Sequence, residues 1–127
     1  MNENDVTGVV VDAAMKVHQA LGPGLLESVY ERILMYELRK RGLRVEAQIP
    51  VPIVFDGLAF DEAFRCDLLV EGKVVVELKS VEEVKNVHKK QVLTYLRLMD
   101  LRVGLLLNFG CELMKQGIHR ISNGMPD

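Results

Sequence analysis

The sequence contains no tryptophan, and aromatic residues make up only 6% of its 127 residues. Hydrophobic residues still account for 49% of the chain, so we expect a core built mainly from aliphatic side chains. Together with 27% charged residues, this composition is typical of a globular protein and argues against disorder. The length fits a single domain over residues 1–127, and pairing with a second copy would bury additional surface.

Cysteine and long apolar runs are also scarce. The two cysteines, Cys66 and Cys111, lie far apart and form no CxxC spacing, so we expect no metal role for them. Apolar runs such as Val74–Val76 are far too short to cross a bilayer. Residues 1–5 are polar and acidic, without an apolar signal segment. These features predict a cytoplasmic protein with free thiols and no membrane partner.

A strong charge of one sign is missing as well, since the formal net charge is −2. This excludes a protein that coats nucleic acid by bulk charge alone. It leaves room for a local basic path beside an acidic metal site, because a bound cation partly neutralises the carboxylates. Basic residues cluster at two places, and they either follow a phosphate backbone or form ordinary solvated helix surfaces. The clusters are Arg39, Lys40, Arg41 and Arg44, and Lys85, Lys89 and Lys90.

Periodicity and turn residues predict an α/β protein without repeats or linkers. Gly22-Pro23-Gly24 ends a first amphipathic helix, and Gly42 ends a second. Ser80 is expected to cap a third helix, with Glu83 at the capping-box position. The expected helices span about 6–21, 25–41 and 80–99, and the expected strands about 45–55, 58–70, 73–79, 103–108 and 117–121.

The strands are expected to form a mixed central sheet flanked by the helices, in the order α-α-β-β-β-α-β(-β). Pro50 and Pro52 remove ladder donors from the first strand, which therefore belongs at a sheet edge or is irregular there. Asp56-Gly57 is a strong hairpin signal. The almost wholly apolar run Val103–Asn108 is typical of a strand buried on both faces of a parallel sheet.

One polar constellation interrupts these apolar strands. Glu77 and Lys79 alternate with Leu78, so both side chains point to one face of their strand. If Asp67 lies on the same face, its carboxylate and that of Glu77 would make a hard oxygen site for Mg²⁺ or Mn²⁺. Such an ion polarises a phosphodiester and lowers the pKa of bound water, and a nearby lysine steadies charge on phosphorus. The same spacing also fits an ordinary cross-strand ion pair, because it is common by chance.

Whether Asp67 joins Glu77 depends on the turn between their strands. A three-residue loop at residues 70–72 puts Asp67 opposite Val75, on the face of Glu77. A two-residue loop at residues 71–72 puts the carboxylates of Asp67 and Glu77 on opposite faces. The functional interpretation therefore requires the longer, bulged turn.

Three motifs together resemble a known family. Gly24-x-x-Glu27-x-x-Tyr30 looks like the signature of the small GxxExxY proteins, which are similar to the PD-(D/E)XK nuclease superfamily. Asp67 with Glu77-x-Lys79 matches the Asp…Glu-x-Lys core of that superfamily. Gln91-x-x-x-Tyr95 looks like the Q-x-x-x-Y element of its RecB-like nucleases. The motifs occur in the family's order, and the resemblance covers roughly Val6 to Ile121.

The resemblance implies a restriction-endonuclease-like core with Mg²⁺ or Mn²⁺ held by Asp67, Glu77 and Glu27. Lys79 would be catalytic together with these carboxylates, and Gln91 and Tyr95 would lie at the site. Without the resemblance, Glu27 also fits a favourable interaction with the helix dipole. Tyr30 either hydrogen-bonds Glu27 or belongs to the core, and His88 is either a surface residue or a phosphate contact.

Two functions follow as hypotheses. The first is a metal-dependent nuclease that cuts phosphodiester bonds in DNA, as a homodimer or with a partner. Its substrate would be a branched or flapped duplex by analogy with junction resolvases of the superfamily. The second is a non-catalytic module that binds nucleic acid or protein on the same fold.

Overall fold

The computed structural model describes residues 1–125. The predicted order of elements is confirmed, and most boundaries agree within two residues. The elements are α1 (Glu3–Leu21), α2 (Glu27–Lys40), β1 (Val45–Phe55), β2 (Leu58–Val70), β3 (Val74–Lys79), α3 (Asn86–Met99), β4 (Val103–Asn108), the short 3₁₀ helix η1 (Met114–Gly117) and β5 (Ile118–Ser122). None of the helices in the described chain is both long and apolar enough to span a membrane.

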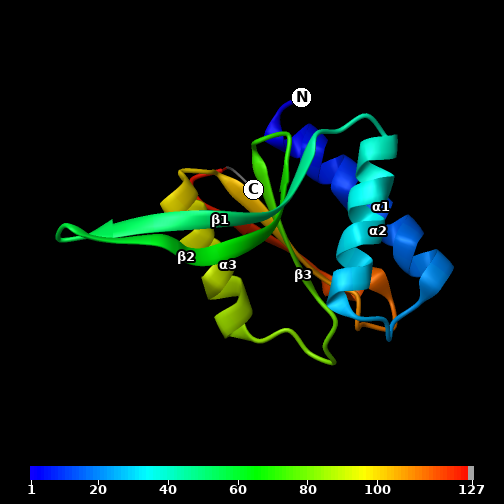
Figure 1. Ribbon diagram of the computed structural model, residues 1–127. Helices are drawn as coiled ribbons and strands as arrows, with labels where there is room; N and C mark the ends of the chain where they lie inside the picture. The colour runs from blue at the N-terminus through cyan, green and yellow to red at the C-terminus, as the bar shows by residue number, and fades with distance from the viewer. Residues whose placement is uncertain (126–127) are drawn as a thin grey trace.

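The five strands form one mixed sheet in the order β1-β2-β3-β4-β5 (Figure 1). Strands β3 and β4 run parallel and α3 connects them, whereas the other neighbours are antiparallel. Strand β1 lies at the edge, as its prolines predicted, and its register shifts between Val51 and Ile53. The proline between these residues cannot donate to the ladder, which accounts for the irregularity.

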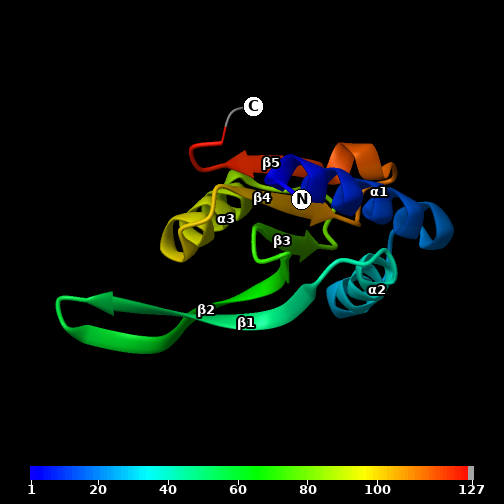
Figure 2. The same cartoon turned by 90° about the horizontal axis from the view of Figure 1, so that it is seen from above.

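Helices cover both faces of the sheet (Figure 2). Helices α1 and α2 pack on one face, where the core includes Val10, Leu34 and Val76. Helix α3 packs on the other face, where Val92 and Leu96 meet the sheet. Both cores are dominated by aliphatic side chains, as the composition predicted. This layered α/β arrangement is consistent with the predicted restriction-endonuclease-like fold.

The far end of the β1–β2 hairpin projects from the body of the protein as an arm (Figures 1 and 2). Its tip is the predicted Asp56-Gly57 turn, where both residues have positive φ, 48° and 81°. This backbone matches the twist of a two-residue hairpin. Large apolar side chains of the arm are exposed, and they are Val54, Phe55, Leu58 and Phe60.

The predicted start of the third helix is wrong. Helix α3 begins at Asn86, and the Ser80 hydroxyl donates to the Leu25 carbonyl (2.8 Å) instead of capping α3. The segment between β3 and α3 is held by the amide of Asn108, which is fully buried. Its Oδ1 accepts from the Val81 backbone N–H (3.0 Å), and its Nδ2 donates to the Val81 carbonyl (2.9 Å). This long-range clamp outweighs the local capping preference.

The first basic cluster is largely engaged within the fold. Arg41 binds Asp12 (2.6 Å) and Glu37 (3.2 Å), which joins α2 to α1. Arg44 pairs with Glu71 (3.5 Å). Arg39 donates to the Val45 carbonyl, and Lys40 has a long contact with Glu37, so only Arg41 and Arg44 of the four cations have close carboxylate partners.

Candidate functional site

The strands β2 and β3 bring Asp67 and Glu77 together. Their ladder ends at the pair Leu68–Val76, so the next residues along, Asp67 and Glu77, face each other. Directly opposed residues of an antiparallel pair project to the same face of a sheet. The two carboxylates are therefore on one face, which the functional interpretation required.

The predicted loop was displaced by one position. The connection consists of residues 71–73 rather than 70–72, and Asp67 accordingly lies opposite Glu77 rather than Val75. The first two loop residues have φ angles of 54° and 64°. The shift is an even number of positions along β3, so it leaves the side-chain face unchanged.

Where the backbone hydrogen bonds between β2 and β3 end, hydrogen bonds to the two carboxylates continue the pairing. Glu77 Oε1 accepts from the Asp67 backbone N–H (2.9 Å). Asp67 Oδ2 accepts from the Leu78 backbone N–H (3.0 Å). One oxygen of each carboxylate thus satisfies a backbone donor, and the exchange fixes both side chains next to each other.

Glu77 is an unusually placed carboxylate, since only 8% of its surface is exposed. Burial, followed by the neighbouring charge of Asp67, raises the pKa of Glu77 to about 8, while the charge of Lys79 acts in the opposite direction. A buried carboxyl with a raised pKa and a second carboxyl beside it is typical of functional sites.

A third carboxylate, Glu31 on α2, lies next to the pair. It was not among the site residues predicted from the sequence. The Gln48 amide donates to Glu31 Oε1 (2.7 Å) and reaches Asp67 Oδ1 (3.4 Å). Burial raises the pKa of Glu31, the Gln48 hydrogen bond opposes that rise, and Asp67 adds to it. Glu31 lies one helical turn after Glu27, so helical spacing was the signal that would have found it.

Lys79 ends β3 on the same face as Glu77 and is half-buried. Within residues 1–125, no ion pair joins Lys79 to Asp67 or Glu77. The alternative interpretation of a simple cross-strand ion pair is therefore wrong. Lys79 remains close enough for its charge to favour the ionised form of Glu77.

Gln91 and Tyr95 line a hollow of about 420 Å³ between β2 and α3. Tyr95 stacks on Phe64 with the ring centroids 3.8 Å apart. Burial raises the pKa of Tyr95, and the charges of Glu77 and Asp67 raise it further. Gln91 is exposed at the rim of this hollow. Tyr95 is therefore close enough to the carboxylates for their charges to act on it, although no hydrogen bond within residues 1–125 joins them.

The remaining predicted residues have other surroundings. Glu27 is exposed at the start of α2, and the described residues give it no hydrogen bond or ion pair. The ring Nδ1 of His88 accepts from the Lys85 backbone N–H (3.1 Å) and so closes the start of α3. One of its nitrogens is therefore committed to the fold.

Tyr30 belongs to the core and to the α1–α2 turn rather than to the carboxylates. It is fully buried and stacks on Phe109 at 4.5 Å. Its hydroxyl donates to the Gly22 carbonyl and accepts from the Leu25 backbone N–H (3.2 Å). Of the two roles that the sequence left open for Tyr30, a hydrogen bond to Glu27 or a place in the core, the structure shows the second.

The Tyr30→Phe variant is expected to lose about 1–2 kcal/mol of stability, because the buried ring loses two part-buried hydrogen bonds to the backbone of the α1–α2 turn. Urea unfolding measures this change. Tyr36→Phe is the matched control, since Tyr36 is exposed and no change is expected there. A loss of activity in Tyr30→Phe with unchanged stability would contradict this structural role.

The chemistry of the site fits a hard divalent cation. Among the described residues, no three His, Cys, Asp or Glu side chains are already gathered as a metal site. The donors nearby are nevertheless carboxylate oxygens of Asp67, Glu77 and Glu31, which suit Mg²⁺ or Mn²⁺. Burial, with the charge of Asp67 added to it, raises the pKa values of Glu77 and Glu31. A bound cation would supply a counter-charge.

Comparison with known proteins agrees with this geometry. The family model described as the PD-(D/E)XK nuclease superfamily matches residues 4–121. No match was found among curated proteins or among solved structures. The match covers nearly the whole chain, including both carboxylate-bearing strands and the two helices beside them. The chain therefore belongs to the PD-(D/E)XK nuclease superfamily.

Proposed function

We propose that the protein is a metal-dependent nuclease that hydrolyses phosphodiester bonds in DNA. The observation that carries this proposal is the pair formed by half-buried Asp67 and buried Glu77, with Lys79 two residues beyond Glu77 on the same strand face. A structural carboxylate pair would be expected to have a cation of the protein beside it. Here no ion pair within the described residues joins Asp67 or Glu77 to a cation, and only the more distant charge of Lys79 acts on Glu77.

Each residue of the site has a proposed role. Asp67 and Glu77 would hold Mg²⁺ or Mn²⁺, with Glu27 or the better-placed Glu31 as a further ligand. When bound, the cation supplies a polarised phosphoryl oxygen and an acidified water. Lys79 would stabilise the negative charge that develops on phosphorus.

Gln91 and Tyr95 would position the substrate beside the carboxylates, because both line the adjoining hollow. Membership of the GxxExxY proteins and preference for branched or flapped DNA remain proposals. So does the homodimer, for which the exposed apolar residues of the β1–β2 arm are a surface that a second copy would cover.

The test is a cleavage assay on single-stranded, duplex and branched DNA with Mg²⁺ or Mn²⁺. The wild-type protein is expected to cut at least one substrate, and Asp67→Ala and Lys79→Ala are expected to lose at least about a hundredfold in rate. Lys115→Ala, an exposed lysine of η1, is the control. Cleavage that survives both site substitutions would show that the proposed site is wrong.

A second candidate function is a non-catalytic module that binds nucleic acid or protein. It is favoured by the lack of a ready-made three-ligand metal site among the described residues. DNA binding without cleavage, and no metal-dependent rise in melting temperature, would support it.

A further inference from the structure

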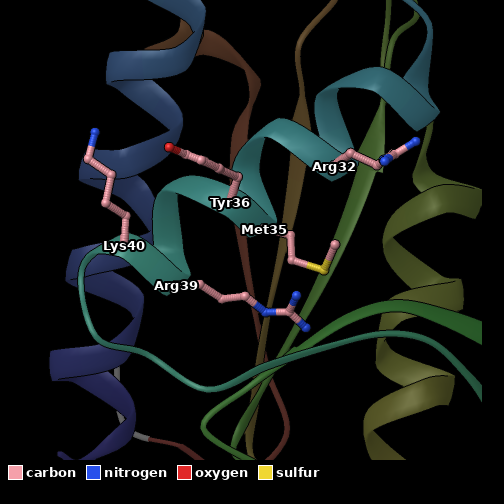
Figure 3. Close-up of a pocket in the computed structure, with 5 residues that line it drawn as sticks. All are labelled: Arg32, Met35, Tyr36, Arg39 and Lys40. Atoms are coloured by element: carbon pink, nitrogen blue, oxygen red, sulfur yellow. The ribbon is translucent and has the colours of Figure 1, made fainter.

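The exposed side of α2 carries a cationic surface that the candidate site does not use. It surrounds a hollow of about 490 Å³ that is lined by Arg32, Met35, Tyr36, Arg39 and Lys40 (Figure 3). These positions recur at steps of three and four, so they form one face of the helix. We call them the α2 surface.

The charges of the α2 surface are not neutralised nearby. No carboxylate is among the residues that line the hollow. Arg32 has no ion pair within the described chain, and Lys40 has only a long contact of 3.9 Å with Glu37. Arg39 donates to the Val45 carbonyl (2.7 Å), which anchors its guanidinium between α2 and β1. The surface therefore presents three positive charges to a ligand.

An aromatic ring lies among these cations. Tyr36 is 64% exposed, and Lys40 Nζ is 6.0 Å from its ring centroid. The ring of Tyr36 does not pack in the core, and one of its faces is accessible to a ligand. Aromatic rings interleaved with basic residues are typical of surfaces that stack bases and pair with phosphates.

The α2 surface lies on the helix that carries Glu31, and Met35 of this surface is one helical turn after Glu31. Glu31, which adjoins Asp67, immediately precedes Arg32 on the same helix. The rise of a helix puts Arg39 about 12 Å further along its axis from Glu31. This separation is short enough for a strand with one phosphate at the carboxylates to reach both Arg32 and Arg39.

We propose that the α2 surface binds an unpaired stretch of the nucleic acid whose phosphodiester is held at Asp67 and Glu77. The inference rests on the proposed function for its ligand class. Arg32, Arg39 and Lys40 contact successive phosphates, and Tyr36 stacks on a base. Unpaired strands are the class that fits, because bases within a duplex are stacked on each other and do not offer a face to Tyr36.

The test is fluorescence anisotropy with a labelled oligothymidylate of about 20 nucleotides, without divalent metal so that no cleavage occurs. Arg32→Ala and Lys40→Ala are each expected to weaken binding by roughly three- to tenfold and to lower the salt slope by about 0.7. Tyr36→Ala is expected to weaken it at least about fivefold with an unchanged salt slope, whereas Tyr36→Phe retains binding.

Lys115→Ala is the matched control, because Lys115 is exposed and α1 lies between η1 and α2 (Figure 2). A wild-type protein that binds no oligonucleotide would overturn the proposal, and so would variants that bind like wild type. Equal binding of a duplex, with no effect of Tyr36→Ala, would also overturn it. Binding by a protein without cleavage activity would reject the nuclease alone and leave the α2 surface supported.

Discussion

Replacing Glu77 with glutamine is expected to abolish cleavage and, above neutral pH, to stabilise the protein. Glutamine keeps an oxygen for the Asp67 backbone N–H, so the local hydrogen bond survives. It removes the charge that would hold the cation and that burial and Asp67 disfavour. We expect cleavage to fall by at least roughly a hundredfold. Function and stability thus oppose each other at this residue.

The sign of the pH effect follows from the raised pKa of Glu77. The folded protein keeps a proton on Glu77 up to about pH 8, whereas the unfolded chain releases it near 4.5. The folded state binds more protons over this interval, so the free energy of unfolding falls as pH rises. At about pH 8 the Glu77→Gln variant is expected to be more stable by about 1–3 kcal/mol, and the gain vanishes near pH 5.

Denaturant unfolding of both proteins across this pH range measures the effect, and Mg²⁺ adds a second readout. Mg²⁺ is expected to raise the melting temperature of wild type at high pH and to leave that of Glu77→Gln unchanged. Glu46→Gln is the matched control, because Glu46 is exposed on β1. Parallel pH profiles for wild type and Glu77→Gln would show that Glu77 is not the titrating group.

Replacing Asn108 with alanine is expected to cost about 2–4 kcal/mol of stability. The fully buried amide binds both backbone groups of Val81 and accepts from the Gly110 backbone N–H (3.0 Å). Alanine leaves these groups without a partner inside the protein. The approach is close, since a Cβ on Gly110 would lie 2.2 Å from the Val81 carbonyl oxygen.

Urea unfolding measures the loss, and hydrogen exchange locates it. Exchange is expected to increase in residues 80–85, because the clamp joins that segment to the end of β4. Gln116→Ala, an exposed amide of η1, is expected to change stability by less than about 0.5 kcal/mol. An unchanged exchange rate in residues 80–85 would contradict the role of the clamp.

Local patterns predicted most of the architecture. Hydrophobic periodicity placed the helices and strands, and the prolines of β1 placed it at the sheet edge. The start of α3 was missed because the clamp involves Asn108, which lies 27 residues from Val81 in sequence. Local capping preferences do not predict a contact between residues so far apart in the sequence.

The candidate site shows the same division. Alternation along β3 placed Glu77 and Lys79 on one face, and the order of the motifs pointed to the superfamily. The contact of Glu31 with Gln48 was not predicted, because it joins α2 to β1 across the fold. Tyr30 had two roles open, and only the packing of α2 against Phe109 decided between them.

The sequence by itself determined the order of elements, the apolar faces and the common face of Glu77 and Lys79, because these depend on local spacing. The tertiary structure decided that Asp67 and Glu77 meet, because their register depends on the backbone of the β2–β3 turn. It also decided that Glu77 is buried beside a second carboxyl, and hence that its pKa rises to about 8. Burial and charge proximity are properties of the packed fold, which no local pattern contains.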